Sequence, residues 1–113
     1  MVEALSTSYA TKLVSAAEAV TVVKPGHKVF TGTGCATPLA LIGALEAVRP
    51  APSDVEIFHF LTSGLRGVMG NQPSQYRHRC YFVGADMVEY VRRGTAEYVP
   101  ISLTQIPRLI ENG

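Results

Sequence analysis

The stretch Phe30–Leu45, FTGTGCATPLALIGAL, decides how this chain folds. It reads as the end of a strand, a glycine-rich turn and the start of a helix. Thr37 is a typical N-cap, and Pro38 suits the first helical turn because no amide hydrogen is needed there. Glycines at the turn let the backbone bend sharply and let a ligand approach closely. Apolar residues at helical spacing predict the buried face of the helix: Leu41, Ala44, Leu45 and Val48.

The segments on either side continue an alternation of helix and strand. Upstream, Ser15 and Glu18 form a capping box before a helix that ends at the Pro-Gly of residues 24–26. Its apolar face is predicted to be Ala16, Ala19, Val20 and Val23. Strands are predicted at residues 27–32, 55–61, 79–84 and 96–100, and further helices at residues 85–93 and beyond residue 103. This order predicts an α/β domain with a mostly parallel sheet of about four strands and helices on both faces.

Composition limits the function classes. The 113 residues fit one small domain, with 47% hydrophobic and 17% charged residues and a net charge of +1. This balance is typical of a folded protein and gives no electrostatic case for nucleic acid or for an anionic membrane. We see neither a signal peptide nor an apolar run of membrane-spanning length, so we expect a cytoplasmic protein. Cys35 and Cys80 are expected to be free thiols.

The glycine turn matches no standard phosphate motif. Its third glycine position holds Thr37, which departs from the dinucleotide fingerprint, and no Gly-Lys-Ser/Thr follows as in a P-loop. However, the first turn of the following helix carries no Asp or Glu, so its positive end could face an anion or an oxyanion. Two interpretations stay open at this point, a ligand-binding loop and a plain turn between strand and helix.

Other candidate groups are weaker. Cys35 near a helix start could act as a nucleophile if a histidine lay beside it, but spacing places none of the three histidines there. His78 and Cys80 lack a second ligand pair, so we predict no metal site. Arg77, His78 and Arg79 are either a phosphate or carboxylate contact or a solvated basic rim. Residues 62–78 read as a long, glycine-rich loop of the kind that often carries function.

Together these segments resemble the N-terminal part of the acetyl-CoA hydrolase/CoA-transferase family, which includes acetate and 4-hydroxybutyrate CoA-transferases. The resemblance begins with YATKLVSAAEAVTVVKPGHKVF, continues through the glycine loop and PLALIGAL, and includes VEIFHF. Its last block is YRHRCYFVGADMVEYVRRGTAEYVPISLTQIPRLI. The matching positions there are Arg77, His78, Phe82, Val83, Gly84, Gly94, Ala96, Tyr98, Pro100, Leu103, Ile106, Pro107 and Leu109. His27 and Glu97 depart from the pattern, since the family usually has aspartate at both positions.

The resemblance implies a partial CoA-transferase-like (NagB/RpiA-like) domain over residues 1–113 whose glycine loop lies at an acyl-CoA site. It implies coenzyme A or acyl-CoA as a substrate, with no covalently bound cofactor. The implied cofactor-binding residues are Gly32, Thr33, Gly34, Cys35, Ala36, Pro38, Arg77 and His78.

The family's covalent chemistry uses a glutamate in a second, C-terminal domain, and no residue of this chain matches it. We therefore expect no catalytic residue here and no activity from the chain alone, so that a partner chain would have to supply the missing domain. A second interpretation is a non-catalytic ligand-binding or assembly module that forms a homo-oligomer, most simply a dimer. A third is a small hydrolase that uses Cys35 with a histidine.

Overall fold

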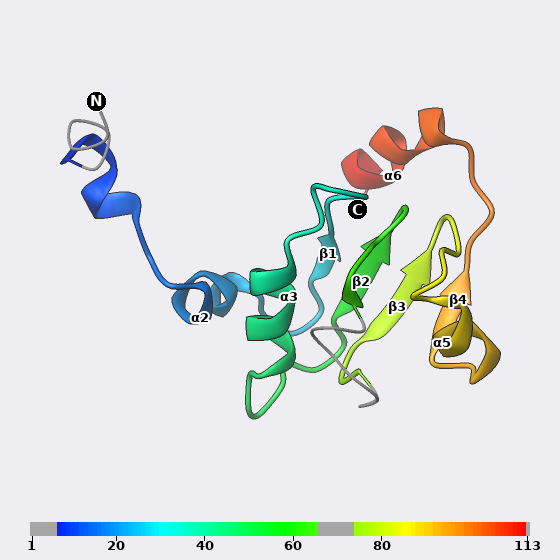
Figure 1. Ribbon diagram of the computed structural model, residues 1–113, viewed down its shortest axis with the longest axis horizontal. Helices are drawn as coiled ribbons and strands as arrows, with labels where there is room; N and C mark the ends of the chain where they lie inside the picture. The colour runs from blue at the N-terminus through cyan, green and yellow to red at the C-terminus, as the bar shows by residue number, and fades with distance from the viewer. Residues whose placement is uncertain (1–6, 66–73, 113) are drawn as a thin grey trace.

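A computed structural model describes residues 7–65 and 74–112 of the chain. Its centre is a sheet of four parallel strands in the order β1-β2-β3-β4 (Figure 1). The strands are β1 (Lys28–Phe30), β2 (Glu56–His59), β3 (Arg77–Cys80) and β4 (Ala96–Tyr98). The predicted α/β class and parallel sheet are confirmed.

α3 (Leu39–Glu46) and α5 (Val88–Arg92) cover one face of this sheet. The other helical segments are η1 (Ala10–Lys12), α2 (Ala16–Ala19), η2 (Val20–Val22), η3 (Leu103–Gln105) and α6 (Ile106–Asn112). Figure 1 shows α2 and α3 at the β1 side and α5 beside β4. α6 approaches the opposite face, where Leu109 and Ile110 lie near Phe30 and Phe58. Helices therefore flank both faces, as predicted.

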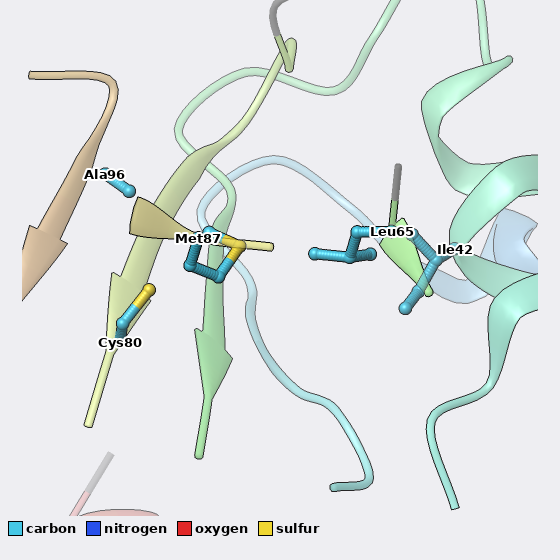
Figure 2. Packing of buried hydrophobic residues seen from close by; sticks show 5 residues of the cluster. All are labelled: Ile42, Leu65, Cys80, Met87 and Ala96. Atoms are coloured by element: carbon cyan, nitrogen blue, oxygen red, sulfur yellow. The ribbon is translucent and has the colours of Figure 1, made fainter. Parts of the chain in front are cut away.

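The core lies on the α3 side of the sheet and consists of two clusters. One joins Ile42 of α3 and Leu65 to side chains of β3 and β4, as Figure 2 shows with Met87 between Leu65 and the pair Cys80 and Ala96. The other joins Val20, Leu45, Val55, Ile57 and Tyr76. Alternate strand residues point into these clusters. In β2, fully buried residues therefore alternate with half-buried ones, as in a sheet that packs one face against the core.

The N-terminal helix follows its sequence signals. The Ser15 hydroxyl accepts a hydrogen bond from the Glu18 backbone amide at 3.2 Å, which confirms the predicted cap. Val20 is buried and Val23 packs on the second cluster, as the predicted apolar face requires. Near the other end, Pro107 lies in the first turn of α6, where a proline costs no hydrogen bond.

The third strand and the helix after it were placed wrongly. The strand lies at Arg77–Cys80 rather than at 79–84, because its pairing runs alongside Glu56–His59 of β2. The alternation of buried His78 and Cys80 with charged arginines was hidden by the apolar run that follows. α5 is also shorter than predicted and begins at Val88. The long-loop prediction for 62–78 ran past its end into β3, and residues 66–73 lie outside the described residues.

The start of α3 also differs from the prediction. Pro38 holds the N-cap position and the helix begins at Leu39, so Thr37 is not the cap. The Thr37 hydroxyl instead donates to the Gly34 carbonyl at 2.7 Å. Leu41 is 42% exposed, whereas Ile42 is buried. Leu45 is buried and Ala44 and Val48 pack against the second cluster, as predicted, so only Leu41 of the predicted face is wrong.

Candidate functional site

The glycine loop, residues 32–38 between β1 and α3, needs glycine at two positions. A Cβ on Gly32 would lie 2.4 Å from the Ala36 carbonyl oxygen, closer than any real contact. Gly34 has φ +56°, a conformation that favours glycine. The Ala36 amide donates to the Thr33 carbonyl at 2.9 Å, which closes the turn. The loop is therefore a tight backbone structure at the carboxyl end of β1.

A second loop, residues 61–65 after β2, lies directly against the first. The Gly34 amide donates to the Leu61 carbonyl at 2.6 Å, and Gly34 forms a parallel bridge with Thr62. The Thr33 hydroxyl donates to the same Leu61 carbonyl at 2.9 Å and accepts from the Leu61 amide at 3.0 Å. Sheet pairing thus continues past β1 and β2 into both loops. In open α/β sheets, ligands bind at this carboxyl-end edge.

Asp86 fixes the second loop from a third segment. Its Oδ2 accepts hydrogen bonds from the Gly64 amide at 2.6 Å and the Leu65 amide at 3.3 Å. Gly64 has φ +85°, and a Cβ there would press against Leu39 of α3 at 2.9 Å. Asp86 falls within the helix predicted at residues 85–93, but α5 begins only at Val88 and the Asp86 carboxylate lies against the loop. Sequence spacing carried no signal for this contact between segments more than 20 residues apart.

A line of hydrogen-bonded side chains lies on the α3 side of the sheet and leads to the same loops. His59 Nε2 lies 2.6 Å from His78 Nδ1, and the two rings are stacked with centroids 4.9 Å apart. At one end, His59 Nδ1 lies 2.6 Å from the Thr62 hydroxyl. At the other, His78 Nε2 lies 2.6 Å from the Ser74 hydroxyl, which donates to Glu46. We call this line the relay; its members are Glu46, Ser74, His78, His59 and Thr62.

The ionisation of the relay follows from its burial. Burial, and to a smaller extent the charge of His78, lower the pKa of His59 to about 3, so His59 is neutral. Burial alone would raise the pKa of Glu46, but hydrogen bonds from His78 and Ser74 hold it below the ordinary value. Glu46 is therefore a carboxylate. Sequence reasoning missed His59 because it lies within the apolar run VEIFHFL, although its period-2 spacing from Ile57 marks the buried face.

The structure brings together only part of the predicted site. Gly32, Thr33, Gly34, Cys35, Ala36 and Pro38 share one loop, where Cys35 is exposed. His78 is buried below the sheet and reaches the loops only through His59. Arg77 begins β3 at the opposite edge of the sheet, where it pairs with Asp54 at 2.6 Å and Glu56 at 3.0 Å. It therefore does not share a site with the glycine loop.

Both cysteines of the chain lie within the described residues. Cys35 and Cys80 are both free thiols, as predicted. Burial raises the pKa of Cys80 to about 11, so its thiol stays protonated.

Within residues 7–65 and 74–112, no group of three or more His, Cys, Asp or Glu side chains is placed to hold a metal ion. No helix in this part of the chain is long and apolar enough to cross a membrane.

Comparison with known proteins gives the family. Residues 2–113 match the model of the acetyl-CoA hydrolase/transferase N-terminal domain. The chain belongs to this family. It is 32% identical over 89 residues to a succinyl-CoA:acetate/propanoyl-CoA:succinate CoA transferase of Fasciola hepatica, a match that covers 77% of this chain and 18% of that protein. It is 29% identical over 105 residues to the 4-hydroxybutyrate coenzyme A transferase of Clostridium kluyveri, covering 91% of this chain and 24% of that protein.

A solved structure supports the same relationship. The crystal structure of RipA from Yersinia pestis matches this CoA-transferase family chain with a TM-score of 0.73 and 28% identity. The match covers 89% of this chain and 26% of that one. The chain thus spans about a quarter or less of the relatives that it matches.

Proposed function

We propose that this domain contributes an acyl-CoA-binding loop to CoA-transferase chemistry and does not turn over acyl-CoA alone. The observation that carries the proposal is the glycine loop, which is held by Leu61 and Thr62 at the carboxyl end of a parallel sheet. Membership of a family whose relatives are CoA transferases supports acyl-CoA as the ligand.

The helix start that follows the loop favours an anion or a developing oxyanion, such as that of a thioester or carboxylate. α3 has no acidic residue in its first turn, so its amide dipoles favour an anion or an oxyanion ahead of Leu39. Backbone amides aimed at a developing oxyanion stabilise it strongly in a site of low dielectric. The loop would supply binding and polarisation, while the carboxylate nucleophile would come from a region that this chain does not match.

Calorimetry with coenzyme A and acetyl-CoA tests the proposal, with two glycine variants as a matched pair. Gly34 and Gly26 both have positive φ, and a Cβ at either would meet no atom within 4 Å. Gly34→Ala and Gly26→Ala therefore carry similar backbone strain, but only Gly34 lies in the loop. We expect Gly34→Ala to weaken acetyl-CoA binding by roughly tenfold and Gly26→Ala to leave it unchanged. Equal affinities in the two variants, or no binding by the unaltered chain, would overturn the proposal.

A second function is favoured by the face of the sheet that α6 only partly covers. A cavity of about 450 Å³ opens there between Phe30, Phe58 and Tyr81 on the sheet side and Leu109 and Ile110 on α6. Phe30 is 44% exposed and Ile110 61% exposed. Lys28, Glu56 and Arg79 also line this cavity, and exposed apolar side chains gathered beside such polar groups mark interaction sites. We propose that this face pairs with a second copy of the chain, most simply as a two-fold dimer.

A further inference from the structure

The relay has a direction that its carboxylate end determines. Glu46 is ionised and can only accept, so the Ser74 hydroxyl must donate to it. The Ser74 oxygen then accepts from His78 Nε2–H, which leaves His78 Nδ1 as an acceptor when the ring is neutral. Each later bond follows from the one before it. One carboxylate on α3 thus sets both imidazole tautomers.

The same reasoning reaches the loops. His59 Nε2–H donates to His78 Nδ1, so His59 Nδ1 carries no proton and accepts from the Thr62 hydroxyl. The Thr31 hydroxyl also lies 3.3 Å from this nitrogen, but it lies at the same distance from the Phe58 carbonyl, which can only accept. Thr62 is 3% exposed and its backbone bridges Gly34, so the residue that bonds His59 through its hydroxyl is also paired with the glycine loop through its main chain.

One added proton reverses the bond at Thr62. The pair of rings gains one N–H, and His78 Nε2 lies 3.7 Å from a Glu46 oxygen. His78 Nδ1–H then donates to His59 Nε2, and the proton that was on that nitrogen is replaced by one on Nδ1. His59 Nδ1–H now donates to Thr62, whose oxygen changes from donor to acceptor. The count balances at one proton gained and two hydrogen bonds reversed, the one between the two rings and the one between His59 and Thr62.

We propose that the relay is a positioning element that couples the ionisation of Glu46 and His78 to Thr62 and hence to the conformation of the glycine loop. The inference rests on the proposed function for its consequence on ligand binding, since the loop would be the acyl-CoA site. The direction of the hydrogen bonds and their effect on the conformation of the glycine loop do not depend on a bound ligand. His59 and His78 act through Thr62 and are positioning residues.

Other charged or titratable groups around the pair leave this direction intact. From the segment before β3, Tyr76 donates its hydroxyl to the Leu45 carbonyl at 2.8 Å, and burial raises its pKa. Cys80 on β3 has its pKa raised to about 11 by burial. The Tyr90 ring of α5 packs 6.4 Å from the His78 ring. At the end of α3, Arg49 donates to the Glu46 backbone carbonyl at 2.7 Å. Neither Tyr76 nor Cys80 changes charge near neutral pH, so Glu46 and the two histidines carry the switch.

Nitrogen NMR of the histidine rings tests the direction in the ligand-free chain. At pH 7.5 we expect both His59 and His78 to carry the proton on Nε2. Glu46→Gln keeps the size of the side chain but removes the fixed acceptor, because an amide can donate or accept. We expect mixed tautomers in Glu46→Gln and unchanged ones in Glu18→Gln, an exposed carboxylate on α2. An Nδ1–H tautomer at either ring of the unaltered chain would overturn the relay.

Amide hydrogen exchange at Gly34 tests the coupling to the loop. Thr62→Val removes the hydroxyl with little change of shape and should speed exchange of the Gly34 amide by roughly tenfold. Thr21→Val removes an exposed hydroxyl that donates to the Glu18 backbone carbonyl, and it should leave the exchange rate of the Gly34 amide unchanged. Unchanged exchange in both would overturn the coupling. Acetyl-CoA titrations at pH 7.5 and 5.5 then separate the two proposals. A pH-dependent exchange rate at Gly34 without binding would refute only the acyl-CoA assignment, whereas binding without that pH dependence would refute only the relay.

Discussion

His59 and His78 face each other in the core with His59 Nε2 2.6 Å from His78 Nδ1, although 19 residues separate them in the chain. They come from adjacent parallel strands, where Ile57 pairs with His78 and His59 with Cys80, so the two imidazoles meet diagonally. Both are almost completely buried. Their polar atoms are nonetheless satisfied by each other and by hydroxyl groups, which is the condition for a buried polar pair to be tolerated.

The stability of the chain should fall as the pH drops below about 6.5. In the folded state burial lowers the pKa of His59 from 6.5 to about 3, so the unfolded chain takes up a proton that the folded chain refuses. The contribution is fully present above pH 6.5 and is lost as the pH falls toward 3. Between pH 6.5 and 5 we expect a loss of about 1.4 kcal/mol per pH unit, measured by urea unfolding.

A pair of histidine variants assigns this pH dependence. His59→Gln should flatten the dependence between pH 6.5 and 5, even if the variant is less stable at every pH. His27→Gln should preserve it, because His27 is exposed and only accepts from the Lys24 amide. A dependence that survives in His59→Gln and vanishes in His27→Gln would contradict the assignment.

Asp86 should stabilise the second loop more than a surface carboxylate stabilises its neighbours. Asp86→Asn weakens two charge-assisted hydrogen bonds to the Gly64 and Leu65 amides, so we expect a loss of about 1 kcal/mol in the free energy of unfolding. Asp54→Asn breaks an ion pair with Arg77 whose partners are 70% and 59% exposed. Such exposed pairs contribute little, so a loss well below 1 kcal/mol is expected. Equal losses in urea unfolding would show that Asp86 has no special role.

The sequence predicted the parts of the fold that depend on neighbours along the chain. Ser15 caps its helix as predicted, and the alternation of segments predicted the parallel sheet. Features that depend on contacts across the fold were missed. Thr37 looks like a cap, but its hydroxyl donates to Gly34 and accepts from the Ser63 amide, a residue 26 positions away.

In the candidate site, too, local features were predicted and features that depend on contacts across the fold were missed. The glycine loop was predicted because its geometry is local: a Cβ at Gly32 would clash with Ala36, and the positive φ of Gly34 favours glycine. Arg77 was grouped with the loop because both belong to one family pattern, yet the parallel register puts Arg77 beside Glu56 at the amino ends of the strands. His59 drew no attention in an apolar run. Its role appears only when the register brings it to His78.

The chain should not transfer coenzyme A by itself. Among the described residues, no glutamate lies on the glycine loop. The glutamates of α3 and β2 already have partners: Glu46 is hydrogen-bonded to Ser74, and Glu56 pairs with Arg77 and Arg79. A carboxylate nucleophile must be free to attack the acyl group. Acetyl-CoA mixed with the chain and a carboxylate acceptor should therefore show no transfer above the buffer rate. Turnover that disappears in Cys35→Ala would support a cysteine hydrolase instead.

The cavity under α6 should control self-association. Ile110→Glu replaces an apolar group of the cavity by a charge, and taking a charge out of water in an interface is costly even though Lys28, Glu56 and Arg79 also line the cavity. Light scattering coupled to size exclusion should show a dimer for the unaltered chain and a monomer for this variant. Val22→Glu is a matched control, because Val22 is 71% exposed on η2 and does not line the cavity. It should remain dimeric. A monomeric unaltered chain at high concentration, or dimers of both variants, would place self-association elsewhere or exclude it.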